Sequence, residues 1–297
     1  MVYPALVKWQ PGTENDDVVD QRGDSSGGGG GGFGGGRLAG GSVATVIVVV
    51  LVARLFGVDV SGLLGGGHQG GTAPAPTQPH PPTGDDPDKE LVQFVKFVMK
   101  DIQDTFEATF KAEGKPYRRA KLYLFSHAIN TGCGRSSSAI GPFYCPADEH
   151  AYIDLSFYRE LKQRFGAPGQ FAQAYVLAHE LGHHAQNLLG VEQQAQRLGR
   201  GHSRNEISVR QELQADCYAG VWGHAAQGKG LLEVGELEQA ITAATAIGDD
   251  RLQKQAGQEV NPETFTHGSS AQRVRWFRRG FDAGKLGACD TFSAAEL

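Results

Sequence analysis

The sequence has no excess of basic residues. Its 28 lysines and arginines are outnumbered by 33 aspartates and glutamates, so the formal net charge is -5 at pH 7 and the sequence pI is near 6.1. Proteins that bind nucleic acid neutralise phosphates with lysine and arginine, and this chain has no domain-wide surplus of either. A nucleic-acid partner is therefore not expected.

Cysteine is scarce, and the four cysteines lack the spacing of a thiolate metal site. No two of them form a C-x-x-C pair, which argues against zinc bound by sulfur. An even number of cysteines indicates disulfides and an extracytoplasmic location, although four residues allow three pairings. The simplest arrangement pairs the two that are closest in sequence, and closing so short a loop would stabilise the fold by about 3 kcal/mol. The predicted disulfides are Cys133–Cys145 and Cys217–Cys289.

The chain also lacks a secretory cleavage site directly after its most apolar stretch. Residues 1–39 precede this stretch, and that position together with the missing site argues against a cleaved signal peptide. Residues 40–58 are instead predicted to form a single transmembrane signal anchor, because at about 1.5 Å per residue they just cross a hydrocarbon core of roughly 30 Å. A buried β-strand is the alternative, but the glycine-rich sequence before it and the polar sequence after it offer such a strand no partner.

The few charges beside this stretch predict its orientation. Arg22 and Arg37 lie on its N-terminal side, whereas after Arg54 no lysine or arginine occurs until Lys89. Positive charge is retained on the cytoplasmic side of membrane proteins. The sequence therefore predicts a single-pass protein of the cell membrane, with a cytoplasmic N-terminus and an extracytoplasmic C-terminal domain.

Composition divides the chain into four segments. Residues 1–39 include the glycine run Gly27–Gly32 and are expected to be disordered, because glycine loses the most backbone entropy on ordering and buries no side chain. After the anchor over residues 40–58, the proline-rich residues 59–88 are expected to form an extended linker. Residues 89–297 are expected to form the folded domain.

Helical patterns predominate in this domain. Helices are predicted from Lys89 onwards, over residues 231–255 and over residues 270–279, whereas residues 121–126 and 150–158 read as strands. The first helix has an apolar face for packing, which consists of Leu91, Val95, Val98, Ile102, Phe106 and Phe110.

The run from Phe171 to Leu189 predicts a helix that carries two histidines on one face. Apolar or small residues recur there at spacings of three and four. His179 and His183 are four residues apart, so both imidazoles can bind one metal ion. Glu180 follows the first histidine directly, which places its carboxylate beside the metal without making it the natural third ligand. This H-E-x-x-H pattern predicts a zinc peptidase with Glu180 as general base.

A second predicted helix, over residues 203–220, offers a third ligand. Glu212 and Asp216 are four residues apart and share a face, so one can bind the metal while the other orients a ligand. Asp216 could accept a hydrogen bond from the second ring N–H of His179. Gly182 costs about 1 kcal/mol of helix propensity relative to alanine, and we expect it to let this second helix approach closely.

The sequence resembles the gluzincin metallopeptidases, in which H-E-x-x-H is followed on a later helix by E-x-x-x-D. More closely, it resembles the bacterial, membrane-anchored family of putative neutral zinc metallopeptidases. The resemblance covers most of the chain from about Lys89 onwards. The matching stretches are GCGRSSSAIGPFYCPADEHAYIDLSFY (132–158), LAHELGHHAQ (177–186), RQELQADCYAGVW (210–222), AIGDDRLQ (246–253) and FTHGSSAQRVRWFRRG (265–280).

The resemblance implies a fold and a metal site. The expected fold is α+β and zincin-like, mainly helical with a small sheet, behind a single transmembrane helix. One catalytic zinc ion is expected on His179, His183 and Glu212, with Asp216 behind His179.

Further site residues follow from the same resemblance. An edge strand beside the metal binds the extended substrate, and residues 152–157 are the candidate, so Tyr152 and Asp154 are expected to bind substrate. A plain core strand is the alternative. His267 is expected to donate a hydrogen bond to the oxyanion, with Arg273 near the substrate, unless His267 only caps its helix.

These residues predict an endopeptidase for protein or peptide substrates. Zinc would lower the pKa of water to about 7, and Glu180 would take the proton and return it to the leaving amine. The alternative is a non-catalytic zinc-containing module of the cell envelope that binds peptides or has a structural role. A glutamate beside the ligands has little purpose in a closed structural site, so its presence favours the peptidase.

Overall fold

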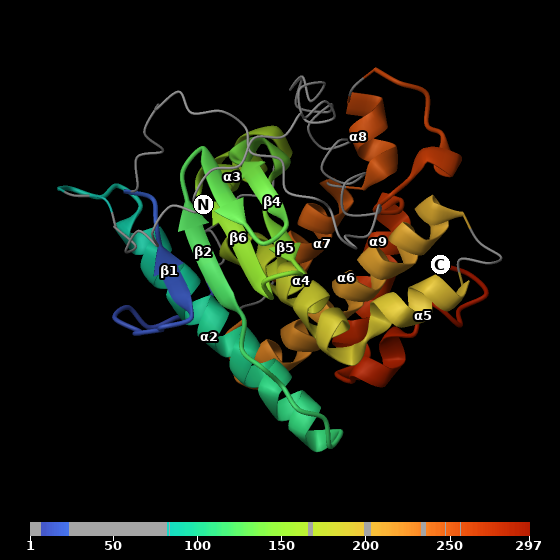
Figure 1. The fold of residues 1–297 in the computed structure, drawn as a ribbon, viewed down its shortest axis with the longest axis horizontal. Coiled ribbons are helices and arrows are strands. Elements are labelled where there is room, and N and C mark those ends of the chain that lie inside the picture. Colours follow the sequence, from blue (N-terminus) through green and yellow to red (C-terminus); the bar gives the residue numbers. More distant parts are fainter. Residues whose placement is uncertain are drawn as a thin grey trace, which may run out of the picture.

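The computed structural model describes residues 7–23, 82, 84–165, 169–198, 203–232, 236–246, 248–255 and 257–297. Within these residues a mixed sheet and a group of helices pack around one large apolar core (Figure 1). The helices are α2 (Lys89–Ala112), α3 (Ser156–Phe165), α4 (Gln170–Leu189), α5 (Val191–Leu198), α6 (Arg204–Gly228), α7 (Glu236–Ala246), α8 (Asp249–Gln255) and α9 (Ser270–Ala283). Short 3-10 turns lie at Ser138–Ile140, Pro262–Thr264 and η4 (Leu286–Cys289).

The main sheet has four strands in the order β1-β2-β6-β5. β1 (Val18–Asp20) and β6 (His150–Asp154) both run parallel to β2 (Lys121–Phe125), and β5 (Phe143–Cys145) runs antiparallel to β6. β3 (Ala128–Thr131) and β4 (Gly134–Ser137) form a separate antiparallel hairpin. Among the described strands, β6 is therefore an inner strand and β5 lies at an edge of the sheet.

α4 lies at the centre of the described structure and contacts the sheet as well as other helices (Figure 1). It is apolar on several sides, and Phe171, Tyr175 and Leu181 are inaccessible to solvent. A helix that is buried on most sides needs such a sequence, since burying each large apolar side chain contributes about 1.5–3 kcal/mol. α4 ends at Leu189 and is capped by Gly190, whose φ of 71° is the left-handed conformation that glycine adopts without strain.

Two close helix contacts place α6 against its neighbours. A Cβ atom at Gly182 of α4 would lie 2.8 Å from the carbonyl oxygen of Ala215, so only glycine permits this spacing. The prediction that Gly182 allows close approach of the two helices is confirmed. On the other side of α6, a Cβ atom at Gly280 of α9 would lie 1.9 Å from the carbonyl oxygen of Cys217. Both contacts bring side chains of α4 and α9 toward the same part of α6.

Both predicted disulfides are present. Cys133 is bonded to Cys145, and Cys217 is bonded to Cys289 across 72 residues. The second bond joins α6 to η4. It holds the C-terminal part of the chain against the helix that also carries Glu212.

Several predicted elements have different ends in the structure. The strand predicted over residues 150–158 stops at Asp154, and helix α3 begins at Ser156. The carboxylate of Asp154 accepts the backbone N–H of Ser156 at 2.9 Å, which favours a helix start at this point. The helix predicted over residues 231–255 is divided into α7 and α8, with Gly248 between them.

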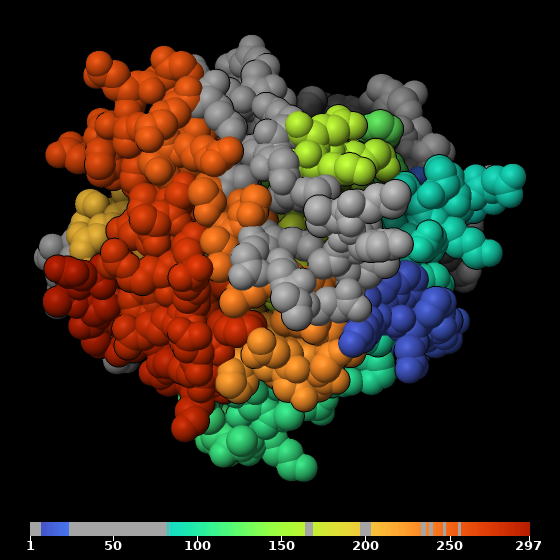
Figure 2. Space-filling model, turned by 180° about the vertical axis from the view of Figure 1, so that it is seen from behind, coloured from blue at the N-terminus to red at the C-terminus, as the bar shows by residue number. Residues whose placement is uncertain are grey.

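The N-terminal segment belongs to the domain, so the prediction of disorder over all of residues 1–39 is wrong. β1 pairs with β2, with Val18 opposite Leu122. The ring of Trp9 packs edge-on against Phe94 of α2, with 5.8 Å between ring centres. Figure 2 shows residues 7–23, in blue, against the residues that lead into α2. A strand of three residues is too short to show an alternating sequence pattern. Its stability comes from pairing with strands that are distant in the sequence.

An ion cluster ties the end of this segment to the start of α2. The guanidinium of Arg22, whose side chain is only 6% exposed, lies 2.7 Å from a carboxylate oxygen of Asp20 and 2.7 Å from one of Asp86. Asp88 lies slightly farther from the same group, at 3.7 Å. Residues 20–22 and residues 86–88 are therefore held together at one place, which we call the Arg22 clasp.

The predicted fold of a zincin-like domain behind one transmembrane helix needs correction. Residues 40–58, the predicted helix, lie outside the described residues, and among the described helices none is long and apolar enough to cross a membrane. The single-pass arrangement is also inconsistent with the sheet, because β1 precedes these residues and β2 follows them. One crossing between the two strands would put them on opposite sides of a membrane. Hydropathy describes only a local stretch of sequence, so it cannot predict the pairing of β1 with β2.

Candidate metal centre

The three side chains selected from the sequence as metal ligands meet between α4 and α6. One ligand atom from each of His179, His183 and Glu212 lies within 4.8 Å of the other two. The distance from Nε2 of His179 to Oε2 of Glu212 is 3.2 Å, and that from Nε2 of His183 to Oε1 of Glu212 is 3.6 Å. Both imidazoles thus present the same ring nitrogen to one carboxylate.

This donor set fits zinc. Two imidazole nitrogens and one carboxylate are the ligands of one class of catalytic zinc sites, and three protein ligands leave a fourth position for water or substrate. Burial by itself would raise the pKa of Glu212, but His183 and His179 hold it well below its usual range. An ionised carboxylate is the form that binds a metal ion.

A buried ion network lies behind His179. Nδ1 of His179 is 2.8 Å from Oδ1 of Asp216 on the next turn of α6. Arg273 of α9 donates from Nε to Oδ2 of Asp216 at 2.8 Å and from Nη2 to Oδ1 at 2.9 Å, and the hydroxyl of Tyr175 also donates to Oδ1. Burial would raise the pKa of Asp216, but Arg273 and His179 bring it to about 2. Asp216 therefore accepts the Nδ1–H of His179, which leaves Nε2 for the metal.

His183 has a neutral partner on its own helix. Its Nδ1 lies 2.9 Å from Oε1 of Gln186, three residues further along α4. The amide nitrogen of Gln186 donates to the backbone carbonyl of Gln211 at 2.7 Å and to Oε1 of Gln214 at 3.0 Å. The sequence reasoning missed this contact, although the spacing of three residues on a helix is a signal that could have found it.

Glu180 lies beside the ligands without belonging to the group of three donors. Glu180 is 8% exposed. Burial raises the pKa of its carboxyl group, while His179 and His183 lower that pKa in part. A raised pKa brings a carboxylate closer to the neutral range in which a general base works.

His267 lies within electrostatic reach of the site and is held by Asp249 at the start of α8. One oxygen of Asp249 accepts the backbone N–H groups of Thr266, His267 and Gly268, and the other lies 3.2 Å from Nδ1 of His267. Burial lowers the pKa of His267, but Asp249 and Glu212 raise it above its usual value. Asp249 was not identified from the sequence, because its contact with His267 depends on how α8 and α9 pack.

The three residues expected to bind substrate have other contacts. Arg273 is 2% exposed and pairs with Asp216, behind the ligands. The ring of Tyr152 is stacked between Tyr123 and Phe143, on an inner strand. Asp154 accepts backbone N–H groups, including that of His127 at 3.0 Å. These positions indicate support of the fold, and the inner position of β6 rules out its use as an edge.

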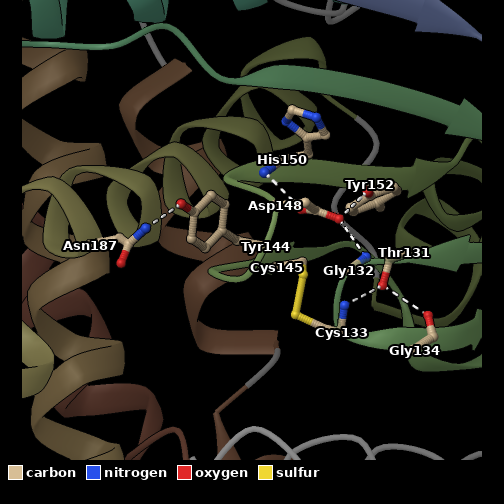
Figure 3. The surroundings of a disulfide bond; sticks show 10 residues. All are labelled: Thr131, Gly132, Cys133, Gly134, Tyr144, Cys145, Asp148, His150, Tyr152 and Asn187. Carbon is tan, nitrogen blue, oxygen red and sulfur yellow. Dashed lines mark hydrogen bonds between the residues drawn. A yellow bond between two sulfur atoms is a disulfide. The ribbon is translucent and has the colours of Figure 1, made fainter. Parts of the chain in front are cut away.

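Edge strand β5 is joined both to a disulfide and to the helix of the site, as Figure 3 shows. Cys145 in β5 is bonded to Cys133, in the turn between β3 and β4. The hydroxyl of Tyr144 accepts from Nδ2 of Asn187 at 3.0 Å and lies 3.0 Å from Nδ1 of His184, and both partners are on α4. The position of β5 relative to α4 is therefore fixed by side-chain contacts.

Sequence comparisons show which proteins this chain is similar to. The family described as putative neutral zinc metallopeptidase matches residues 7–292. The chain is 45% identical to Uncharacterized protein YpfJ of Escherichia coli strain K12 over 289 residues, which are 96% of this chain and 99% of the relative. It is 42% identical to Uncharacterized protein Rv2575 of Mycobacterium tuberculosis strain H37Rv over 261 residues, or 82% of this chain and 86% of the relative. No solved structure matches the chain.

Proposed function

The chain belongs to the putative neutral zinc metallopeptidase family, and we propose that it is a zinc-dependent endopeptidase with Glu180 as its general base. The observation that carries the proposal is the meeting of His179, His183 and Glu212, with a buried carboxylate beside them that is not one of the grouped donors. A purely structural metal site has no need for that additional carboxylate.

The residues of the chain divide the chemistry among them. His179, His183 and Glu212 would hold the zinc ion, which would act as a Lewis acid on the peptide carbonyl and lower the pKa of water to about 7. Glu180 takes the proton of the attacking water and returns it to the leaving amine. His267, oriented by Asp249, donates a hydrogen bond to the oxygen of the carbonyl as negative charge develops there.

We assign substrate binding to the edge of β5 in place of β6. In the described sheet, β5 pairs with β6 on one side only, and contacts with Asn187 and His184 connect it to α4. An extended peptide can add to such an edge through backbone hydrogen bonds. Methylating single backbone nitrogens of a cleaved peptide should lower kcat/KM at alternate positions. Equal effects at successive positions would contradict strand addition.

The disulfides support an extracytoplasmic location. Disulfides persist in oxidising compartments and are rare in the cytoplasm. Protein isolated from its native cells under denaturing, thiol-blocking conditions should therefore show no free thiols at Cys133, Cys145, Cys217 and Cys289. Four free thiols would contradict this location.

The decisive experiment compares the wild-type chain with Glu180→Gln, with both disulfides intact. Zinc content and cleavage of a mixture of unfolded proteins are measured on the same samples. We expect both proteins to bind zinc and only the wild type to cleave. A matched control is Glu107→Gln on α2, since Glu107 is exposed and its ion pair with Arg119 lies at the surface, where such pairs contribute little.

Two results would overturn the proposal. A wild-type protein that binds zinc and cleaves nothing would have the binding or structural role instead. A wild-type protein that does not bind zinc would refute the assignment of the metal centre.

A further inference from the structure

The two histidines of the metal centre are supported in different ways. Nδ1 of His179 faces Asp216, which is ionised and paired with Arg273. Nδ1 of His183 faces the uncharged side chain of Gln186 at 2.9 Å. An amide can present either an oxygen or an NH2 group, so its effect on His183 depends on which way it is turned.

Backbone carbonyl groups determine the orientation of this amide. A carbonyl oxygen only accepts hydrogen bonds, and the carbonyl of Gln211 faces Gln186 at 2.7 Å. The NH2 group of Gln186 must therefore point to Gln211, and its oxygen must point to His183. In the same way, the carbonyl of Cys289 accepts from Nε2 of Gln214 at 2.9 Å, so the oxygen of Gln214 points to Gln186.

Because both glutamines are buried, each amide has only one favourable orientation. Gln186 is 6% exposed and Gln214 is 5% exposed, so an amide turned the wrong way would place two oxygens or two NH2 groups against each other without water. Burying such unsatisfied groups is strongly unfavourable. The sequence of contacts from Cys289 through Gln214 and Gln186 to His183 therefore has a single polarity, and we call it the glutamine relay.

We infer that Gln186 is a positioning residue for the metal ligand His183, and that the glutamine relay holds His183 as the tautomer with its proton on Nδ1 and a free lone pair on Nε2. The inference rests on the proposed metal site and adds to it a second group of supporting residues, separate from Asp216. The relay ends at the backbone of Cys289, whose disulfide to Cys217 anchors η4 on α6. The orientation of His183 is thus set by contacts within the protein.

The test measures zinc affinity by competition with a chromophoric chelator, and does not use peptidase activity. Removing a hydrogen-bond partner behind a metal ligand lowers affinity by about 10- to 100-fold. We expect Gln186→Leu to weaken zinc binding by about tenfold or more. Gln214→Leu should have a smaller effect, because Gln186 keeps its contact with the carbonyl of Gln211. The matched control is Gln196→Leu, an exposed position on α5.

A second variant separates positioning from a general loss of stability. Gln186→Glu keeps an oxygen acceptor for the Nδ1–H of His183 but cannot donate to Gln211 or Gln214. We expect Gln186→Glu to bind zinc at least about threefold more tightly than Gln186→Leu, although its metal-free form is no more stable to urea. Positioning predicts this separation, whereas a structural role predicts that affinity follows stability in both variants.

The possible outcomes distinguish this inference from the proposed function. Wild-type affinity in Gln186→Leu, or losses in Gln186→Leu and Gln186→Glu that match their losses of stability, would overturn the positioning role and leave the peptidase proposal intact. Failure of the wild type to bind zinc would overturn both. Weaker binding in Gln186→Leu, with recovery in Gln186→Glu, would support the inference even if no peptide were cleaved.

Discussion

Replacing Gly182 with alanine should separate the two helices that supply the metal ligands. The added Cβ atom would lie 2.8 Å from the carbonyl oxygen of Ala215 and 3.1 Å from its Cα atom. Both neighbours are backbone atoms of α6, so no side chain can turn aside to make room. We expect α4 and α6 to move apart by roughly half an ångström, since an ordinary contact of this kind needs about that much more space.

Opposing effects should keep the loss of stability small. The loss of zinc affinity, in contrast, should be large. Overpacking a well-packed contact costs about 1–3 kcal/mol, while alanine recovers about 1 kcal/mol of helix propensity. The net loss of stability should therefore be about 1 kcal/mol. Metal–ligand distances, in contrast, must agree with their preferred values within about 0.2 Å. A shift of half an ångström between Glu212 and the two histidines exceeds that tolerance.

The assay combines urea unfolding of the metal-free protein with chelator competition for zinc. Gly228→Ala is the matched control, because Gly228 is the last residue of α6 and a Cβ atom there meets nothing within 4 Å. The control should be unchanged or more stable by up to about 1 kcal/mol, with unchanged zinc affinity. Gly182→Ala should be less stable and should bind zinc at least about tenfold more weakly.

One result would refute this reasoning. If Gly182→Ala were as stable as Gly228→Ala and bound zinc like the wild type, the spacing of α4 and α6 would not determine the geometry of the ligands. The close contact would then have no role in the metal centre.

Three further outcomes are expected. The pKa of Asp216 is lowered to about 2, so the stability that Asp216 contributes is present above the unfolded value near 3.8 and is lost as the pH falls toward 2. In acid titrations of the metal-free protein, the wild type should therefore lose about 2 kcal/mol more of its free energy of unfolding than Asp216→Asn. Parallel curves of stability against pH for the two proteins would contradict this. Asp249→Asn should lower kcat by about tenfold or more with unchanged zinc content, because it releases His267, whereas unchanged kcat would remove His267 from the mechanism. Deleting residues 1–23 should lower the Tm by several degrees through loss of β1 and of Arg22, and an unchanged Tm would show that this segment adds nothing to the fold.

The centre of the metal site was predictable from the sequence because it depends on helix periodicity. Two histidines four residues apart on one helix must share a face, and the same holds for Glu212 and Asp216 on another. The structure shows that all four side chains meet, with Asp216 behind His179 as predicted. The close helix contact at Gly182 was also predictable, because glycine destabilises a helix interior and its presence there indicates close packing.

The remaining parts depend on contacts between distant segments, and local patterns do not contain them. Tyr152 lies in a segment with the alternating sequence of a half-buried strand, but the position of that strand inside the sheet follows from strand pairing. Arg273 was assigned to substrate from the resemblance to the gluzincins, whereas the close packing of α9 on α6 turns it toward Asp216. The span over residues 40–58 was inferred from hydropathy, and the pairing of β1 with β2 overturned the single-pass arrangement.

The Arg22 clasp has a consequence for how this family can change in evolution. Because residues 20–22 and 86–88 are held at one place, the sequence between them can lengthen or shorten without moving the strands and helices that carry the site. By loop-closure entropy, doubling the number of residues between two fixed points costs only about 0.6 kcal/mol. Insertions and deletions should therefore accumulate between these two points in relatives, while the sequence on either side of the clasp keeps its length.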